Sequence, residues 1–386
     1  MAPQFLLLLF ASALALIASG VWFLLLYRLV TGNARIPKLS PCAGQPPTVS
    51  AIVATRNEAY NIDGCLKSLL AQPEILEVIV VDDASTDSTA NVVDNLTATT
   101  ERIRLVRSKG PEPGWSGKSY SCHLGSLEAR GEWLLFVDAD TRLSWGTLCG
   151  ALRHAKENSL DALSSMGLLR TPTFWQKISS PFYFGLLSSF LPPDRVNKPD
   201  SKSAYFFGSF ILIRREAYQR AGGHASVKGD VVEDRALGRI AKEMGLRIGL
   251  TNGVRLISAE WGGGFDAGRR ALERIAVPSV AAHPRLAYGF TFALSVLFFI
   301  PLIALTLVPF CAGTLRILLL ASGLLGYGES LFFTIYSSSR LGTRRLFSFL
   351  FPFAEAVFLG ILWSVALRRK KEAAWRGRRY TFKDSI

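Results

Sequence analysis

A long apolar run near the N-terminus constrains the fold of this chain more than any other feature. Residues 5–27 contain no charged side chain over 23 positions. As a helix rising 1.5 Å per residue, this run would extend about 34 Å, enough to cross the hydrocarbon core of a bilayer. The alternative is a cleaved signal peptide, but its apolar run would be shorter and would follow basic residues. We therefore predict a transmembrane helix within residues 1–30.

Three basic residues, Arg28, Arg35 and Lys38, follow the first apolar run. Lys and Arg concentrate on the cytoplasmic side of membrane helices. The chain that follows this run is therefore predicted to face the cytoplasm. The expected location is the cell membrane, with more than one span and a cytoplasmic middle domain.

A second apolar block covers residues 286–367. Polar breaks divide it into three candidate helices, at about 287–309, 315–337 and 346–367. If all three crossed the membrane, the C-terminal tail would lie on the opposite side from the middle domain, against the positive-inside rule. The last candidate contains Pro352 and Glu355, so it is not a clean lipid-facing span. One of the three is therefore expected to be re-entrant or interfacial.

The C-terminal tail, residues 368–386, is strongly basic. Residues 368–379 carry seven Lys or Arg and one Glu, which accounts for +6 of the formal net charge of +14. Such a cluster attracts either nucleic acid or anionic lipid head groups. Because an apolar helix directly precedes the tail, we predict an anionic lipid surface as its partner and no nucleic acid.

The cysteines and histidines give no sign of a metal site. Five cysteines occur, at positions 42, 65, 122, 149 and 311, and no two of them form a CxxC motif. An odd count without such a motif predicts reduced thiols in a protein that faces the cytosol. The four histidines, at 123, 154, 224 and 283, have no metal-ligand spacing.

The middle domain, residues 46–265, alternates strand-like and helix-like stretches. The strand-like runs are 48–58, 77–87 and 132–141, and the helix-like stretches are 57–70, 88–96 and 116–130. Doubly apolar strands joined by helices favour a parallel α/β sheet. Ligands bind beyond the carboxyl ends of such strands. The acids expected to face that crevice are Asp82, Asp83, Asp138 and Asp140.

The stretch GWSGKS, residues 114–119, looks like a phosphate-binding P-loop. That motif is GxxxxGK[ST], and the position five residues before Gly117 holds Glu112 instead of glycine. The sequence therefore does not support a P-loop ATPase. A lysine at the start of a helix and after glycines still suits an anion. The alternative is an ordinary turn and helix cap with Lys118 exposed.

Two further acidic motifs have the spacing of catalytic groups. The triplet DAD, residues 138–140, ends a buried run, and carboxylates in i, i+2 spacing can bind a divalent cation that bridges phosphates. Glu233 and Asp234 open a predicted helix with apolar positions at 237, 240, 241 and 244. Acids also favour helix N-termini without any function. The functional alternative is that one of the two carboxylates is a general base.

Together these motifs resemble family-2 glycosyltransferases with the GT-A fold, in particular the membrane-bound bacterial branch associated with carotenoid and hopanoid lipids. The matching stretches are ATRNE (54–58), VVDDASTDST (80–89), GWSGKSYSCHLG (114–125), FVDADT (136–141), GSFILIRREAYQRAGGH (208–224), VVEDRALG (231–238) and WRGRRY (375–380). The resemblance covers residues 48–260 well. It implies an α/β GT-A domain with an N-terminal transmembrane helix and C-terminal transmembrane or interfacial helices, placed at the inner membrane.

The resemblance also implies roles for individual residues. The nucleotide-sugar donor, most often UDP-linked, would contact Arg56, Glu58, Asp82, Asp83, Lys118 and Asp138. Glu58 and Asp83 would lie at the base and ribose, whereas Asp138 and Asp140 would hold Mg or Mn. Asp234 would be the catalytic base, with Glu233 beside it. The acceptor side would include Gly222, Gly223, His224 and Trp261.

One departure from the family pattern bears on the product. Polymerising members carry Gln-x-x-Arg-Trp after the third acid, and the equivalent region here, AEWGGGFDAGRR (259–270), lacks it. This favours inverting transfer of a single sugar to a membrane lipid of carotenoid, terpenoid or glycolipid type. Two other hypotheses stay open: a polyprenyl-phosphate sugar synthase and a non-catalytic membrane scaffold. The aromatic segment 173–191 is either an interfacial helix, which would bring the crevice to the lipid, or a buried core helix.

Overall fold

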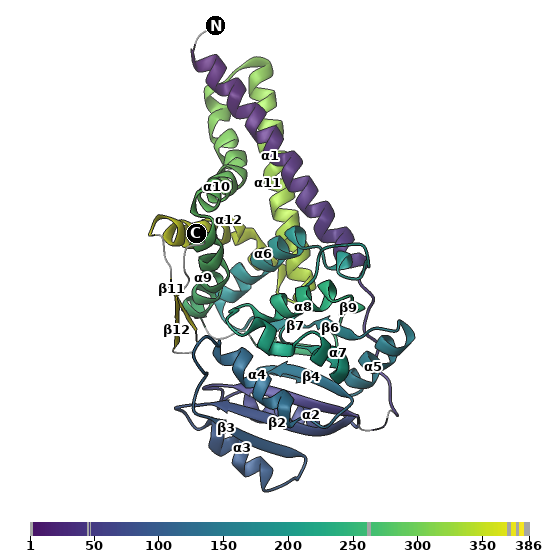
Figure 1. Ribbon diagram of the computed structural model, residues 1–386. Helices are drawn as coiled ribbons and strands as arrows, with labels where there is room; N and C mark the ends of the chain where they lie inside the picture. Colours follow the sequence, from purple (N-terminus) through teal and green to yellow (C-terminus); the bar gives the residue numbers. More distant parts are fainter. Residues whose placement is uncertain are drawn as a thin grey trace. The chain divides into compact units, whose positions relative to one another are not determined.

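The computed structural model describes residues 3–44, 46, 48–260, 264–368, 372–375 and 378–381 (Figure 1). The chain divides into two compact units. The sheet unit comprises residues 35–170 and 193–261, and the helical unit comprises residues 1–34, 171–192 and 262–386. The predicted domain boundaries stay a prediction. The structure adds that residues 171–192 pack with the apolar helices, although they lie within the middle domain in sequence.

A seven-stranded sheet in the order β3-β2-β1-β4-β8-β6-β9 forms the core of the sheet unit. Its strands are β1 (Val49–Thr55), β2 (Ile75–Asp83), β3 (Ile103–Ser108), β4 (Trp133–Asp138), β6 (Ala162–Met166), β8 (Ile211–Arg214) and β9 (Ile248–Asn252). The predicted parallel sheet is wrong for β8, which is antiparallel to β4 and to β6. The first residue of β8, Ile211, pairs with Phe136 near the carboxyl end of β4, so the chain enters β8 from that edge.

Helices cover both faces of this sheet. Along β1, Val49, Ala51 and Val53 join one apolar cluster, whereas Ile52 joins the other, because successive strand side chains point to opposite faces. The first cluster includes side chains of α2 (Ile62–Leu70), α3 (Thr89–Thr97) and α5 (Thr147–Glu157). The second includes side chains of α4 (Gly117–Glu128), α7 (Arg215–Arg220) and α8 (Glu233–Glu243). Burial on both faces explains the nearly continuous apolar runs of the strands.

A second, three-stranded sheet in the order β5-β10-β7 completes the strands of the sheet unit. Its members are β5 (Thr141–Leu143), β10 (Ile257–Glu260) and β7 (Leu168–Arg170). Strand β5 begins directly after the DAD triplet, and the main-chain N–H of Glu260 donates to the carbonyl of Asp140 at 3.3 Å. The small sheet therefore fixes the chain as it leaves the end of β4.

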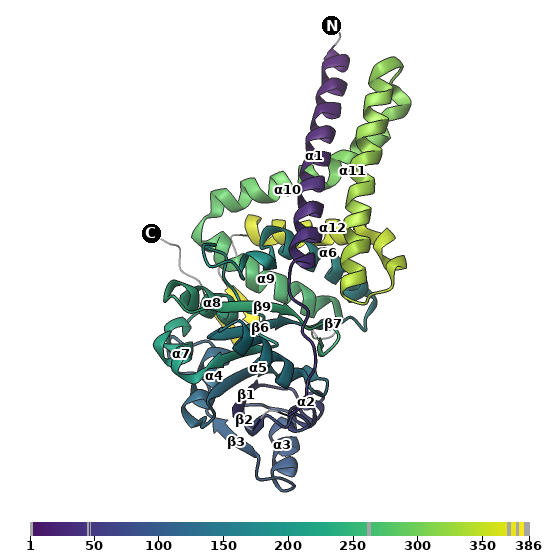
Figure 2. The same cartoon turned by 90° about the vertical axis from the view of Figure 1, so that its right-hand side faces the viewer.

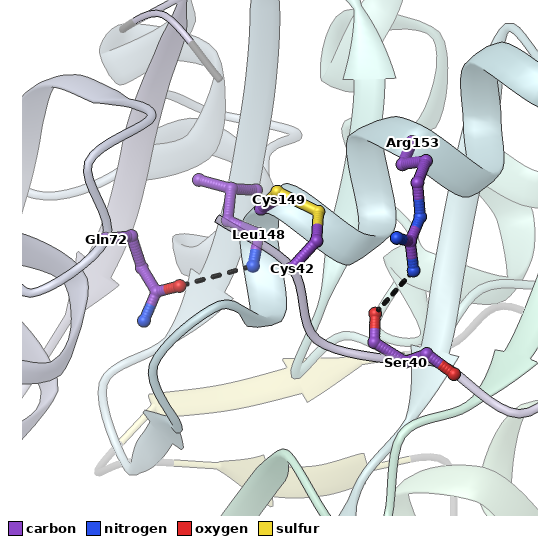
Figure 3. The surroundings of a disulfide bond; sticks show 6 residues. All are labelled: Ser40, Cys42, Gln72, Leu148, Cys149 and Arg153. Atoms are coloured by element: carbon purple, nitrogen blue, oxygen red, sulfur yellow. Dashed lines mark hydrogen bonds between the residues drawn. A yellow bond between two sulfur atoms is a disulfide. The ribbon is translucent and has the colours of Figure 1, made fainter. Parts of the chain in front are cut away.

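Residues 36–42, which we call the N-terminal strap, cross the surface of the sheet unit. The main-chain N–H of Leu39 donates to the carbonyl of Asn252 at 2.9 Å, and the N–H of Asn252 donates to Pro37 at 2.8 Å. The strap ends against α5, where Cys42 forms a disulfide with Cys149 (Figure 3). A Cβ atom added to Gly150 would lie 2.0 Å from the carbonyl oxygen of Ser40, so this close packing requires glycine.

The disulfide corrects the prediction that all five cysteines are reduced thiols. Cys65, Cys122 and Cys311 are free, as predicted, but Cys42 and Cys149 are bonded. The two are separated by 107 residues in sequence and meet only because the strap folds back onto α5. Their spacing therefore carried no signal of the pairing.

The helical unit contains the predicted apolar helices. These are α1 (Pro3–Ala34), α10 (Pro284–Leu307), α11 (Gly313–Arg340) and α12 (Phe351–Leu367), the last preceded by the short helix η4 (Arg345–Leu350). Each of the four apolar segments is long and apolar enough to cross a membrane. The unit also contains α6 (Phe174–Phe190), α9 (Gly264–Ala282), η3 (Val308–Phe310), β11 (Glu372–Trp375) and β12 (Arg378–Thr381).

Trp22 lies at the centre of the helical unit. Its side chain is fully buried, and its ring contacts Phe298 of α10 and Phe333 of α11 at centroid distances of 5.7 and 5.3 Å. The indole N–H donates to the carbonyl of Leu297 at 3.3 Å. One side chain of α1 therefore joins three helices through ring packing and a hydrogen bond.

Helix α6 joins the C-terminal ends of α1 and α11. The guanidinium of Arg28 donates to the carbonyl of Phe190 at the end of α6, at 3.3 Å. At the other end of α6, Lys177 lies 5.6 Å from the ring centroid of Phe347 in η4, which follows α11. The C-terminal ends of α1 and α11 therefore lie at one level of the unit, whereas α12 runs across their direction (Figures 1 and 2).

Candidate functional site

Strand register brings the predicted acids to one edge of the sheet. Thr55 at the end of β1 pairs with Asp82 of β2, and the preceding residue, Ala54, pairs with Asp138 of β4. Neighbouring strands are about 4.8 Å apart, so the three strand ends bring the main chains of these residues side by side, with Thr55 and Asp82 paired on one face and Asp138, opposite Ala54, on the other. The main chains of β1, β2 and β4 therefore end side by side at the carboxyl edge of the sheet, as predicted.

The loops after β1 and β2 are locked together. Asn57 and Ala84 directly follow the two strands, and both have positive φ, 54° and 51°. The main-chain N–H of Asn57 donates to Ser85 Oγ at 3.0 Å. The guanidinium of Arg56 donates to the carbonyls of Asp83 and Ala84. Left-handed backbone at non-glycine residues is uncommon and concentrates at ligand sites. Arg56 here holds the loop that would surround a ligand.

Three buried polar atoms at this edge have no hydrogen-bond partner among the described residues. They are Thr55 Oγ1, Asp82 Oδ1 and Thr141 Oγ1. Almost all buried polar atoms in folded proteins are satisfied, so a group of exceptions requires an explanation. The three atoms have almost no exposed surface, so a polar ligand could reach them only if the surrounding loops rearranged.

Glu58 and Asp83 lie in the same loops and are both buried. The carboxylate of Glu58 accepts a hydrogen bond from the side-chain amide of Asn61 at 3.0 Å, and its main-chain N–H donates to Thr89 Oγ1 at 2.8 Å. Ionised carboxylates accept hydrogen bonds only, which suits the hydroxyl and N–H donors of a sugar or a base. The positions are compatible with the predicted base and ribose contacts.

Lys118 lies between two acids from distant parts of the chain. Its Nζ is 2.6 Å from Asp138 Oδ1 and 2.8 Å from Glu233 Oε1. It is placed by the first turn of α4, where the Ser116 side chain caps the helix by accepting from the N–H of Ser119 at 3.2 Å. The helix cap that the sequence analysis gave as the alternative to an anion site is therefore present. Lys118 itself, however, is ion-paired and not exposed.

Asp234 lies next to Lys118 and Asp138, and the backbone of Gly208 contacts it. The sequence analysis assigned no role to Gly208. Asp234 Oδ2 accepts from the main-chain N–H of Gly208 at 3.0 Å, and its Oδ1 accepts from the N–H of Arg235 at 2.7 Å. A Cβ atom added to Gly208 would lie 2.9 Å from Lys118 Nζ, 3.2 Å from Asp234 Oδ2 and 3.5 Å from Asp138 Oδ2. Glycine allows the backbone to approach all three charged groups. In the sequence, the only indication of this role of Gly208 was its position shortly before β8.

Burial and charge act in opposite directions on Lys118. Burial disfavours the charged amine, but the negative charges of Asp138, Glu233 and Asp234 outweigh burial and raise the pKa of Lys118 well above its usual value. Lys118 is therefore a permanent cation at neutral pH. One cation beside three acids leaves the group net negative, so an anionic ligand such as a phosphate would require a further cation here.

The buried thiol of Cys65 lies beside the DAD triplet. Its Sγ is 3.6 Å from the carbonyl oxygen of Asp138. Burial, reinforced by the charges of Asp140, Asp138 and Glu58 and opposed by Arg142, raises the pKa of this thiol. The thiol is therefore held protonated at neutral pH.

The described residues could supply only part of the coordination shell of a divalent cation. Among the described residues, no group of three or more His, Cys, Asp or Glu side chains surrounds a common point. Asp138 and Asp140 supply hard carboxylate oxygens, and Mg²⁺ is commonly bound by one or two carboxylates together with substrate phosphates and water. Asp138 and Asp140 would therefore hold Mg or Mn jointly with the donor diphosphate.

Three of the residues predicted on the acceptor side have turn or packing roles in the structure. Gly222 and Gly223 have positive φ of 74° and 54°, which a turn before α8 requires. His224 is 1 % exposed, and its Nδ1 lies 2.9 Å from the hydroxyl of Tyr218. Burial, with smaller effects of nearby cations, lowers the pKa of His224 to about 3. His224 is a neutral packing residue here and has no surface for an acceptor. Trp261 lies outside the described residues.

Comparison with known proteins agrees with this geometry. Residues 50–222 match the family described as Glycosyl transferase family 2. The 4,4'-diaponeurosporenoate glycosyltransferases of two Staphylococcus aureus strains, bovine RF122 and USA300, are 28 % identical to this chain, over 222 and 221 residues. The matches cover 55 % and 54 % of this chain. They cover 56 % and 55 % of the two relatives, so this chain spans about half the length of the curated relatives it matches.

One solved structure shares the architecture of the whole chain. It is the mannosyltransferase PcManGT from Pyrobaculum calidifontis, in complex with GDP-Man and Mn2+. The TM-score is 0.59 at 20 % sequence identity, and the match covers 93 % of this chain and 99 % of that one. At this identity the likeness establishes a common fold.

Proposed function

Because residues 50–222 match the family described as Glycosyl transferase family 2, we propose that this chain is a glycosyltransferase that transfers one sugar from a nucleotide-diphosphate sugar to a lipid acceptor in the membrane. The fold that the chain shares with PcManGT and the similarity to the Staphylococcus glycosyltransferases support this proposal. The donor, the metal, the acceptor and the roles of individual residues belong to the proposal. The observation that carries it is the charged group formed by Lys118, Asp138, Glu233 and Asp234.

The proposed acceptor is an apolar lipid of carotenoid or terpenoid type. The Staphylococcus relatives are named for diaponeurosporenoate, a carotenoid acid. Four apolar segments long enough to cross a membrane accompany the catalytic domain here, so an acceptor dissolved in the bilayer would be present at high local concentration. A glycolipid acceptor fits the same helices but lacks the support of these relatives.

The donor would bind along the row of strand ends. The buried acids Glu58 and Asp83 would accept hydrogen bonds from the ribose and the base. The relation of PcManGT to GDP-Man makes a nucleotide-sugar donor reasonable, and a UDP-linked sugar is the form we propose for this chain.

The proposed reaction is a direct displacement at the anomeric carbon. The acceptor oxygen attacks from the face opposite the diphosphate, the glycosidic C–O bond to the diphosphate breaks, and the anomeric configuration inverts. Asp234 takes the proton of an acceptor hydroxyl, and the N–H groups of Gly208 and Arg235 hold its two oxygens in place. Glu233 keeps Lys118 oriented, and Lys118 stabilises the negative charge of the departing diphosphate.

When bound, Mg or Mn would supply further positive charge to the diphosphate. The residues that would hold it are Asp138 and Asp140, and Lys118 orients the carboxylate of Asp138 through their 2.6 Å ion pair. Calorimetry of nucleotide diphosphate binding with and without each cation tests this part. Binding that is equal in the presence of a chelator would exclude it.

The substitution Asp234→Asn tests the proposed base. The amide keeps the size of the side chain but cannot take a proton, so turnover of a hydroxyl acceptor should fall about 10²–10⁴-fold while donor binding is retained. An acceptor that is already a carboxylate needs no base, and its transfer should fall much less. The assay measures lipid product by mass spectrometry in membranes supplied with labelled nucleotide sugars. Unchanged turnover of a hydroxyl acceptor would remove Asp234 from this role.

A polyprenyl-phosphate sugar synthase is the second enzyme hypothesis. It shares the fold, the donor and the membrane location, but the Staphylococcus relatives are named for diaponeurosporenoate and not for a polyprenyl phosphate. Offering both acceptors to the same membranes separates the hypotheses. The third hypothesis, a non-catalytic scaffold, is not favoured, because the acids and the lysine of the site are all present and paired.

The proposed location is the cell membrane, with three spans and a cytoplasmic sheet unit. The C-terminal ends of α1 and α11 are joined by α6, and both are basic, with Arg28 on one and Arg340 on the other. If α1, α10 and α11 span and α12 lies in the interface, the helix ends that carry Arg28 and Arg340 fall on the same side as the basic tail, as the positive-inside rule favours, and Arg316 at the other end of α11 is an exception. Labelling of single cysteines at Gly313 and Ser339 tests this. Gly313→Cys should react from outside the cell and Ser339→Cys only after permeabilisation.

A further inference from the structure

Arg142 is the basic residue nearest in sequence to the DAD triplet, and the proposed reaction gives it no role. It is half-buried on β5, two residues after Asp140. Its guanidinium donates two hydrogen bonds to main-chain carbonyls, from Nη2 to Asn61 at 2.7 Å and from Nη1 to Thr141 at 3.1 Å. The side chain therefore joins the strand that follows the triplet to the residue at the start of α2.

The polarity of α2 does not favour a cation at this position. Asn61 is the N-cap of the helix, and the N-terminal end of a helix carries partial positive charge. Hydrogen bonds from a charged donor are stronger than those from a neutral one, so the contact with the carbonyl of Asn61 opposes this effect. Arg142 is therefore held by specific contacts with the loop and not by the helix dipole.

The close packing of Arg142 on α2 requires glycine at position 64. A Cβ atom added to Gly64 would lie 2.5 Å from Nε of Arg142 and 2.9 Å from its Cζ. Glycine within a helix is unfavourable compared with alanine, and this contact accounts for its presence in the first turn of α2. The guanidinium therefore lies directly against the main chain of the helix.

Asn61, the residue that Arg142 contacts, also holds Glu58. The side-chain amide of Asn61 donates to Glu58 Oε2 at 3.0 Å, and the main-chain N–H of Asn61 donates to the carbonyl of Glu58 at 2.9 Å. Glu58 is 7 % exposed. A continuous series of hydrogen bonds therefore runs from Arg142 through Asn61 to the carboxylate of Glu58.

We propose that Arg142 is a positioning residue that holds the carboxylate of Glu58 in the direction needed to bind the nucleoside of the donor. A binding group keeps its geometry when its own neighbours fix it by hydrogen bonds and packing. Without Arg142, Asn61 and the first turn of α2 lose their contact with β5, so Glu58 loses its fixed direction. This inference rests on the proposed function, which places Glu58 beside the nucleoside.

Calorimetry of UDP and UMP binding to the full-length protein, with Mn²⁺ present, tests the proposal. Arg142→Met should weaken the binding of both nucleotides about tenfold, because both contain the nucleoside that Glu58 would contact. In steady-state kinetics the KM for the donor should rise by about the same factor, with kcat changed less than about twofold. Unchanged binding of both nucleotides would overturn the proposal. A loss confined to UDP would also overturn it, because Arg142 would then act on the second phosphate.

Arg102→Met is the matched control. The guanidinium of Arg102 contacts the opposite end of α2, where it donates to the carbonyls of Leu70, Gln72 and Ile75 at 3.5, 3.5 and 2.6 Å. Its removal should lower the melting temperature and leave the affinity for UDP unchanged. Equal losses of affinity in the two variants would show that only the general stability of α2 matters, and the proposal would fail.

A combination of variants tests the route through Glu58. In a Glu58→Gln protein, Arg142→Met should weaken UDP binding less than about twofold, because the carboxylate that Arg142 positions is already absent. A tenfold loss that persists in this background would show that Arg142 acts on the donor in another way. Gly64→Ala, which displaces the guanidinium but keeps its charge, should also weaken UDP binding without lowering the melting temperature. Normal UDP affinity of this variant would contradict the proposal.

The same titrations separate this inference from the proposed function. If the unaltered protein binds neither UDP nor UMP, the proposed function is contradicted, and this inference fails with it. If the unaltered protein binds both nucleotides and Arg142→Met binds them equally well, only the role of Arg142 is contradicted.

Discussion

The sheet unit and the helical unit bury their polar side chains in different ways. In the sheet unit, polar side chains gather at one edge, where the register of β1, β2 and β4 brings the buried Thr55 and Asp82 and the half-buried Asp138 to neighbouring strand ends. In the helical unit, buried polar groups occur as separate pairs between helices. These pairs are Ser19 with Glu329 at 2.7 Å, Ser330 with Glu355 at 2.8 Å and Ser338 with Ser348 at 2.8 Å.

The difference shows how each architecture uses polar groups. A sheet buried on both faces leaves its strand ends as the place where side chains from distant segments converge, so polar groups there can surround a ligand. Helices in an apolar environment associate through packing and isolated hydrogen bonds, which fix the contact of one pair of helices at a time. Mutations in the two units should therefore separate stability from chemistry.

The largest expected effect is on stability and comes from Trp22. Trp22→Ala removes a fully buried ring that contacts α10 and α11, and the free energy of unfolding of the full-length protein should fall by about 3–5 kcal/mol. Thermal unfolding in detergent measures the change. Phe23→Ala, next in sequence and 61 % exposed, is the control and should have little effect. Loss of nucleotide binding in the folded Trp22 variant would contradict the separation of the two units.

The next effect should be on chemistry alone. Lys118→Met keeps the length of the side chain and removes the cation between Asp138 and Glu233, so kcat/KM should fall about 10²–10³-fold. Steady-state kinetics at several donor concentrations measures it. Lys109→Met, in the preceding loop and exposed, should behave as the unaltered enzyme. An equal loss in both variants would point to general electrostatic attraction of the donor.

A smaller loss of stability is expected when the strap is released. The disulfide closes a loop of 107 residues, and its removal by Cys42→Ser should lower stability by about 2–4 kcal/mol, since the unfolded chain gains freedom. The comparison is thermal unfolding with and without reductant. Cys311→Ser, at a free cysteine, is the control. If reductant shifts the melting temperature of Cys42→Ser as much as that of the unaltered protein, the disulfide is not the cause.

The smallest effect should come from Gly208→Ala. The added methyl group would lie 2.9 Å from Lys118 Nζ, and the flexible lysine can move away at little loss of stability. We expect turnover to fall about tenfold, which corresponds to about 1.4 kcal/mol, with an unchanged melting temperature. Gly20→Ala, where a Cβ has open space, is the matched control. A normal rate for Gly208→Ala would show that the position of Lys118 does not limit the reaction.

Local patterns predicted most of the fold and part of the site. The apolar runs predicted α1, α10, α11 and α12 of the helical unit and β1, β2 and β4 of the sheet unit, but not α9. The acids at the ends of parallel strands were expected at one edge, and the register of β1, β2 and β4 places their main chains there. The helix expected from residue 57 begins at Ile62, since residues 56–61 instead form the loop that contacts the end of β2.

The features that the sequence did not predict depend on contacts between distant segments. The reversal of β8, the approach of Gly208 to Lys118 and the pairing of Cys42 with Cys149 join residues whose own surroundings in sequence are ordinary. The burial of His224 against Phe136 and Tyr218 is of the same kind, because a glycine-rich turn alone does not show which way the imidazole points. Predicting these features requires the packing of the whole sheet unit.

The bond between Cys42 and Cys149 divides the site into two topological parts. The closed loop contains β1, β2, β4 and the acids at their ends, whereas Glu233 and Asp234 lie outside it. While the sulfurs are joined, the N-terminal end of this loop stays fixed to α5. In a reducing cytosol the same loop would open more often, and amide hydrogen exchange in β1 and β2 should then quicken more than exchange in α8.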